Sequence, residues 1–248
     1  MKNSTKLYLI LSISLNYICF GILLYKGASF DKLLENPIYT LLFCLGFLTP
    51  FISALIVRLV YKEEFGGIIG LKTELITIKE PKAVLLILFF LIGHNLFIII
   101  SQQFDRINNI ANLFVYFPAI FLLIGTQELG WRSIVNADYE KINGFWKGTM
   151  TSGLFWTVWF IPVVMLRNFI IIPNALAMFG ALLVGYSFLS QMLYKKSGSI
   201  FLSMLFMALM FSMSAVVDFK QSIVLFIIMI IDAALASTVK NMELKSFF

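Results

Sequence analysis

Long apolar runs and short polar segments alternate along the whole chain. A helix needs about 18 or more mainly apolar residues to cross roughly 30 Å of hydrocarbon. Eight runs approach or exceed that length, at approximately 7–25, 38–60, 83–101, 111–130, 147–166, 174–193, 199–217 and 221–239. The pattern predicts an all-α polytopic membrane protein with about eight transmembrane helices.

The polar segments are too short for a separate aqueous domain, because the longest covers only 62–82. We therefore expect a single membrane domain over 1–248. The segment 62–82 contains FGGIIGLK and is long enough for a short amphipathic stretch on the cytoplasmic surface. The first apolar run follows Lys2 and Lys6, as in a signal peptide, but it is long and no small-residue cleavage site follows. We expect it to be a retained helix.

The composition agrees with a membrane location. Hydrophobic residues make up 60% of the 248 residues and charged residues 13%, whereas about a quarter of an ordinary soluble domain is charged. The expected surroundings are therefore a cell membrane, with several passes through it and membrane lipid as a constant partner.

The basic residues predict the orientation, because lysine and arginine resist translocation and collect in cytoplasmic loops. If the N-terminus is cytoplasmic, 14 of them lie in cytoplasmic segments and five outside: Lys26, Lys32, Arg106, Arg167 and Lys220. Both termini are then cytoplasmic. The same asymmetry accounts for the net charge of +6 without nucleic acid, since the basic segments face anionic lipid headgroups.

Few ionisable residues lie inside the apolar runs, where each costs roughly 2.5–3.5 kcal/mol to insert and is a candidate for function. Glu128 and Arg132 end the fourth run and are four positions apart, which places them on one helix face in the order that favours an ion pair. Arg132 also lies near the cytoplasmic end, where a long side chain reaches the headgroups. The pair is expected to fix the depth of the helix.

His94 and Asp232 are the other intramembrane candidates. His94 is the single histidine, and metal sites need several converging ligands, so we expect a hydrogen bond across a helix interface and no metal or cofactor site. Asp232 has no basic residue within two turns, which leaves a protonated side chain or one that faces a cavity or a partner helix. Cys19 and Cys44 show no disulfide or zinc spacing.

Three segments carry a resemblance to a known family. They are QELGWRSIV from Gln127, SGLFWTVWFIP at 152–162 and YKKSGSIFLSMLFMALMF at 194–211. In order and approximate spacing they resemble the CAAX protease and bacteriocin-processing (CPBP, or Abi) family of intramembrane proteases, over about 121–211. With this resemblance we expect the cell membrane to be a bacterial one. The family motifs are EExxxR, an aromatic residue followed by His four positions on, and His followed by Asn or Asp four positions on.

The resemblance implies a mechanism in which a glutamate and a histidine activate water, while a second histidine and an asparagine stabilise the oxyanion. The retained motif positions are Glu128, Arg132, Trp156 and Pro162. The four catalytic positions of the family are occupied by Gln127, Phe160, Met207 and Phe211. None of these four side chains is a useful base near neutral pH.

The sequence therefore favours a pseudoprotease: a non-catalytic member that acts as a membrane scaffold, a regulator or a bacteriocin-immunity-type protein. Its partner would be a membrane protein or peptide, bound in the groove that its relatives use for cleavage. An active endopeptidase with a displaced site is an alternative, with Glu128 and either His94 or Asp232, although one helical step turns a side chain by about 100°. A small transporter built on His94 and Asp232 is a third hypothesis. The oligomeric state stays open.

Overall fold

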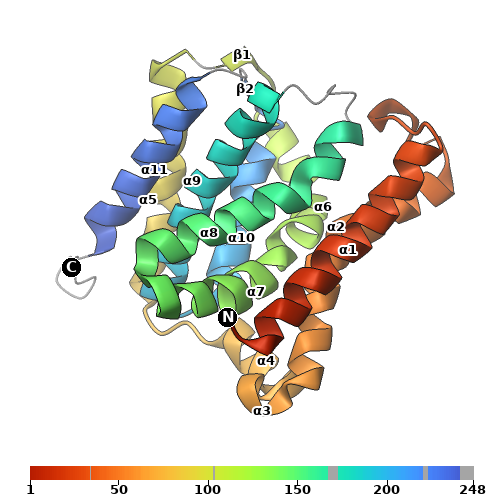
Figure 1. Ribbon diagram of the computed structural model, residues 1–248. Helices are drawn as coiled ribbons and strands as arrows, with labels where there is room; N and C mark the ends of the chain where they lie inside the picture. Colours follow the sequence, from red (N-terminus) through yellow and green to blue (C-terminus); the bar gives the residue numbers. More distant parts are fainter. Residues whose placement is uncertain (34, 103, 167–172, 220–222, 241–248) are drawn as a thin grey trace.

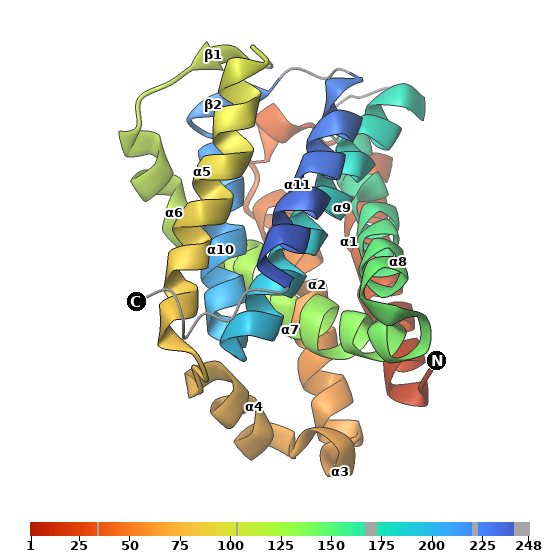
Figure 2. The ribbon, with the colours of Figure 1, turned by 90° about the vertical axis from the view of Figure 1, so that its left-hand side faces the viewer.

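The chain folds as a bundle of helices, seen from two directions in Figures 1 and 2. The computed structural model describes residues 1–248 except 34, 103, 167–172, 220–222 and 241–248. Within these residues the α-helices are α1 Asn3–Tyr25, α2 Pro37–Val60, α3 Lys62–Phe65, α4 Gly67–Ile76, α5 Val84–Ile100, α6 Ala111–Leu123, α7 Glu128–Gly130, α8 Ala137–Leu166, α9 Pro173–Ser197, α10 Ile200–Met213 and α11 Val224–Lys240. The remaining elements are 3-10 turns at Phe30–Lys32, Pro81–Ala83 and Gly125–Gln127, a π-helical segment at Trp131–Asn136, and strands β1 Phe104–Ile107 and β2 Val217–Phe219.

Each predicted apolar run contains a helix, which supports an all-α membrane protein. Five stretches of the described residues are long and apolar enough to cross a membrane: Asn3–Tyr25, Pro37–Val60, Pro81–Ile100, Ala111–Leu166 and Leu176–Ser197. The last two helices are shorter, with 14 residues in α10 and 17 in α11. The number of crossings and the cytoplasmic position of the termini stay predictions. Three residues of the charge count, Arg167, Lys220 and Lys245, lie outside the described residues.

Helix α9 is at the centre of the bundle. It packs against α8, α10, α11 and α5, while α1 pairs with α2 and also contacts α8. The most apolar window of α9 is 78% buried inside the protein, against 33% for α1. Residues of α9 therefore contact protein on most sides, and polar side chains there need protein partners.

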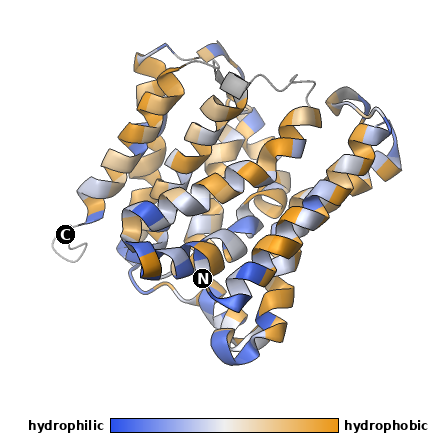
Figure 3. Cartoon of the chain, in the orientation of Figure 1, coloured by the Kyte–Doolittle hydropathy of each residue, from blue (hydrophilic) through white to orange (hydrophobic). Residues whose placement is uncertain are grey.

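The two ends of the bundle differ in polarity. Figure 3 shows hydrophilic residues gathered around the start of α1 and around α3. The start of α1 and the end of α11 lie at this same end, as a topology with both termini on one side requires. Strands β1 and β2 form a short antiparallel pair at the opposite end.

The segment 62–82 contains α3 and α4 at the polar end. Ile68 and Ile69 of α4 are 70% and 80% exposed. The buried Arg58 of α2 contacts α4 through its hydrogen bond to Glu74, and it also donates to Ser133 of the π-helical segment. That α4 lies on a membrane surface stays a prediction.

The sequence predicted one continuous span over 111–130, and here the structure differs. Regular α-helix ends at Leu123, and a 3-10 turn, a short α-helical turn and a π-helical segment follow as far as Asn136. Gly125 lies where α10 approaches most closely, since a Cβ at this position would be 2.8 Å from the Met204 carbonyl oxygen. The EExxxR-like segment therefore lies in irregular helix, a backbone form that is frequent at functional sites.

Candidate functional site

Gln127 lies at the point where the backbone changes from α-helix to 3-10 helix. Its N–H donates to Ile124 O at 3.1 Å, three positions back, so Leu123 O loses its regular helical partner. The Gln127 side chain takes over that carbonyl, with Nε2 donating to Leu123 O at 2.7 Å. The local break and the glutamine side chain thus stabilise each other.

The whole Gln127 amide is hydrogen-bonded. Nε2 also donates to Phe47 O of α2 at 3.1 Å, and Oε1 accepts from Trp156 Nε1 of α8 at 3.1 Å. Because an indole N–H only donates and carbonyls only accept, these partners assign the oxygen and nitrogen ends of the amide. The side chain is fully buried and joins α2, α8 and the 3-10 turn. It has neither a free lone pair directed at a substrate nor useful basicity.

The other family-motif positions pack beside Gln127 as apolar core. The Trp156 ring lies 5.6 Å from Phe160 and 5.8 Å from Phe211, and Phe160 and Phe211 stack at 6.2 Å with an interplanar angle of 10°. Phe160 is 3% exposed, and Met207, one turn before Phe211 on α10, is fully buried. The structure therefore brings Gln127, Trp156, Phe160 and Phe211 together from distant parts of the chain, as the resemblance implies.

Glu128 and Arg132 form the expected ion pair, with Arg132 Nε 2.9 Å from Glu128 Oε2. Both side chains are 0% exposed, so the Arg132 side chain does not extend to the surface of the bundle. That the pair lies at the membrane boundary stays a prediction. Arg132 turns inward and donates to Ser187 O at 3.4 Å and to Ser187 Oγ at 3.1 Å. Ser190 Oγ donates to Glu128 Oε2. The pair joins the α7–π-helical segment to the central helix α9.

Sequence reasoning missed Ser187 and Ser190. They are three positions apart in an apolar helix and so lie on one face, which is a recognisable signal for a polar contact between helices. Their small hydroxyls cost little to bury when a charged partner accepts or donates a hydrogen bond.

His94 and Asp232 form a second buried pair. This pair is a hydrogen bond across a helix interface, as the sequence predicts for His94. His94 Nδ1 lies 2.9 Å from Asp232 Oδ1 and 3.0 Å from Oδ2, and the two residues are 1% and 0% exposed. The Tyr186 ring packs edge-on to His94 at 5.0 Å. Gly185 makes room for the carboxylate, since a Cβ there would be 2.6 Å from Asp232 Oδ2. Asp232 therefore faces a partner helix.

The two polar pairs are separate networks within the described residues. The hydrogen-bond partners of the Glu128 carboxylate are Arg132 and Ser190, and no hydrogen bond connects it to His94 or Asp232. The two pairs contact different residues of α9, Ser187 for Arg132 and Gly185 for Asp232, and Tyr186 packs on His94 and on Phe211. A displaced set that combines Glu128 with His94 or Asp232 would have to move across this packing.

The glutamate of the family motif is expected to be unfavourable at position 127. In Gln127→Glu, a carboxylate oxygen would replace Nε2 and face the carbonyls of Phe47 and Leu123, so both carbonyls would lose the amide donor and the carboxylate would lie against two acceptors. Unsatisfied buried groups cost about 1–3 kcal/mol, so the melting temperature in detergent should fall clearly. Aspartate at the exposed Asn143 is the matched amide-to-acid control and should change little. A Gln127→Glu variant as stable as the parent would contradict this account.

Comparisons with known proteins give one distant relative and no family model that matches. The chain is 25% identical over 183 residues to CAAX prenyl protease 2 from Methanococcus maripaludis. The match covers 67% of this chain and 65% of that protein. The similarity supports a CAAX-protease-like membrane protein, in agreement with the motif order.

Proposed function

We propose that this chain is a non-catalytic relative of CAAX-type intramembrane proteases that acts as a scaffold or regulator for another membrane protein or peptide. The observation that carries the proposal is the environment of Gln127. At the position of the family's catalytic glutamate, two backbone carbonyls face the side-chain nitrogen and an indole N–H faces the oxygen. These neighbours match an amide, whereas a general base needs a free lone pair directed at water.

The chemistry of hydrolysis supports the same conclusion. Amide cleavage requires a base for the water and donors for the oxyanion. At the motif positions, Phe160, Met207 and Phe211 provide neither group. The retained Glu128 is held by Arg132 and Ser190, which gives it a structural use within the bundle.

The packing also changes where a partner would bind. The sequence placed the partner in the family's cleavage groove, but Phe160 and Met207 are buried by neighbouring side chains. A partner therefore contacts the outer surface of the bundle in this proposal, where many apolar side chains are exposed. Such a role needs the frame of helices and does not need a reactive centre.

A cleavage assay tests the proposal. The purified full-length chain and its Glu128→Gln variant would be incubated in detergent with a prenylated CAAX peptide, and products would be measured by mass spectrometry. The Methanococcus maripaludis relative serves as the positive control. We expect the parent to release no more product than the variant.

Hydrolysis by the parent that Glu128→Gln abolishes, with the variant still folded by its melting curve, would overturn the proposal. It would favour an active endopeptidase that uses Glu128. As the matched control, Glu64→Gln alters a glutamate of an exposed ion pair and should leave any hydrolysis unchanged.

A further inference from the structure

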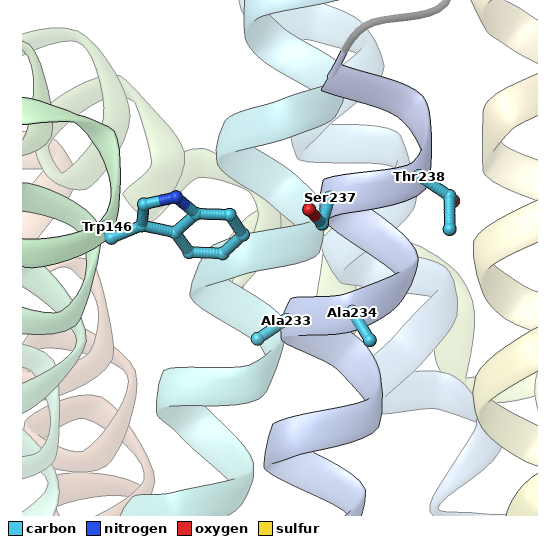
Figure 4. A pocket seen from close by; sticks show the side chains of 5 residues that line it. All are labelled: Trp146, Ala233, Ala234, Ser237 and Thr238. Carbon is cyan, nitrogen blue, oxygen red and sulfur yellow. The ribbon is translucent and has the colours of Figure 1, made fainter.

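A recess of about 500 Å³ opens on the side of the bundle between α8 and α11 (Figure 4). Five residues line it: Trp146, Ala233, Ala234, Ser237 and Thr238. The α11 residues belong to the last two turns before Lys240, so the recess lies near the polar end of the bundle. It shares no lining residue with the motif positions.

The wall formed by Trp146 is held in place by its neighbours. Gly144 has φ +75°, a left-handed conformation that suits glycine, and it breaks α8 immediately before Phe145. Trp146 then packs at 5.0 Å from Phe145 and 5.4 Å from Phe188 of α9. The indole is nevertheless 39% exposed. A tryptophan with one side packed and the other accessible is typical of the membrane–water interface.

The opposite wall is made of small side chains. Ala233, Ala234 and Ser237 leave space along α11, and the Ser237 hydroxyl points across the recess toward Trp146 (Figure 4). Thr238 is oriented away and its Oγ1 donates to Leu235 O at 2.8 Å. The wall is therefore apolar along its length, with one hydroxyl directed into the recess.

The end of the recess next to the last residues of α11 is positively charged. Lys240 Nζ lies 5.9 Å from the centre of the Trp146 ring. Within the part of the chain that the structure describes, no carboxylate lies within 4.0 Å of this ammonium group, whereas the nearby Lys195 is paired with Glu140. Lys196 Nζ donates to Lys240 O at 2.9 Å and adds a second positive charge at the end of α11.

We propose that this recess binds the headgroup and glycerol of an anionic phospholipid. The phosphate would pair with Lys240 and accept a hydrogen bond from Ser237, while an acyl chain would lie along Ala233 and Ala234. Basic pockets between membrane helices bind acidic headgroups in this way, and interfacial tryptophan lies at the same depth. A zwitterionic lipid would bring its own cation toward Lys240 and bind less well. The assignment does not depend on whether the chain is catalytic.

Native mass spectrometry of the full-length chain in detergent tests the assignment. Phosphatidylglycerol and phosphatidylcholine with identical acyl chains would be added separately, and the fraction of protein that retains one lipid would be measured. We expect about fivefold more retention of phosphatidylglycerol, and about a fivefold loss in Lys240→Ala, the factor for roughly 1 kcal/mol per basic residue. Ser237→Trp should cause a similar loss, because the Ser237 side chain points toward Trp146 and an indole there fills the recess.

Lys72→Ala is the control, since it removes an exposed lysine of α4 at the same end of the bundle. Both target residues are exposed, so the variants should melt like the parent. Equal retention of the two lipids, or equal losses in Lys72→Ala and Lys240→Ala, would overturn the site. A dimer that Ser237→Trp dissociates would assign the recess to a second copy of the chain, and retention of glycerol phosphate without acyl chains would exclude a lipid site.

Discussion

Replacing Glu128 by alanine is expected to destabilise the protein by about 3–5 kcal/mol, because it leaves the Arg132 guanidinium buried without its counter-charge. Ser187 would remain as a hydrogen-bond partner and the Trp156 ring as a neighbour of that charge, and neither of them is anionic. Unfolding can be followed by tryptophan fluorescence during titration with dodecyl sulfate in mixed micelles, since Trp131, Trp156 and Trp159 are fully buried and change environment on unfolding. The midpoint should move to clearly lower dodecyl sulfate.

The exposed pair Lys2–Glu64 offers a matched control for this experiment. Its side chains are 45% and 29% exposed, against 0% for both members of the Glu128–Arg132 pair. Exposed pairs contribute about 0–1 kcal/mol, so Glu64→Ala should barely move the midpoint. Replacing Glu128 and Arg132 together by methionine should recover much of the loss, because no unpaired charge then remains. Similar small effects from Glu128→Ala and Glu64→Ala would refute the role of the buried pair.

The helices could be predicted from the sequence because their signal is simple. A run of apolar residues long enough to span hydrocarbon has few alternatives to a helix, since the backbone must satisfy its own hydrogen bonds there. All eight predicted runs contain a helix. The end of α10 was less accurate, because apolar residues beyond Met213 extend the pattern past the helical backbone. The first residues of the last run, 221 and 222, lie outside the described residues.

The site was only partly predictable, because its decisive contacts join distant residues. The order and spacing of the family-like motifs predicted that positions 127, 160, 207 and 211 lie close together. Trp156 contacts Gln127, Phe160 and Phe211, which agrees with this prediction for three of the four positions. Nothing in the local pattern indicated that Phe47 O, 80 positions away, would accept from Gln127. The sequence also did not predict the 3-10 turn and the π-helical segment, since hydrophobic periodicity does not distinguish them from α-helix over a few residues.

The partner of Asp232 could not be predicted from the sequence for the same reason. The sequence shows no basic residue within two turns of Asp232, yet His94 lies beside it from 138 positions away. Local charge patterns detect partners on the same helix, whereas the packing of α5, α9 and α11 determines this contact. The spacing of single polar residues within apolar helices therefore identifies which residues need partners without identifying the partners.

The second large effect is expected at this His94–Asp232 pair. His94→Leu should destabilise the protein by about 3 kcal/mol, because His94 is the hydrogen-bond partner of the Asp232 carboxyl among the described residues and the carboxyl is fully buried. The same dodecyl sulfate titration measures the change.

The double variant His94→Leu with Asp232→Val distinguishes a lost hydrogen bond from lost packing. Removing both polar groups leaves no buried acid or imidazole to satisfy, so the double variant should be more stable than His94→Leu alone. Valine is chosen because it is short enough to fit beside Gly185, where the carboxylate now approaches closely. If the two substitutions instead add their separate losses, the residues act through packing and the pair contributes no coupling between α5 and α11.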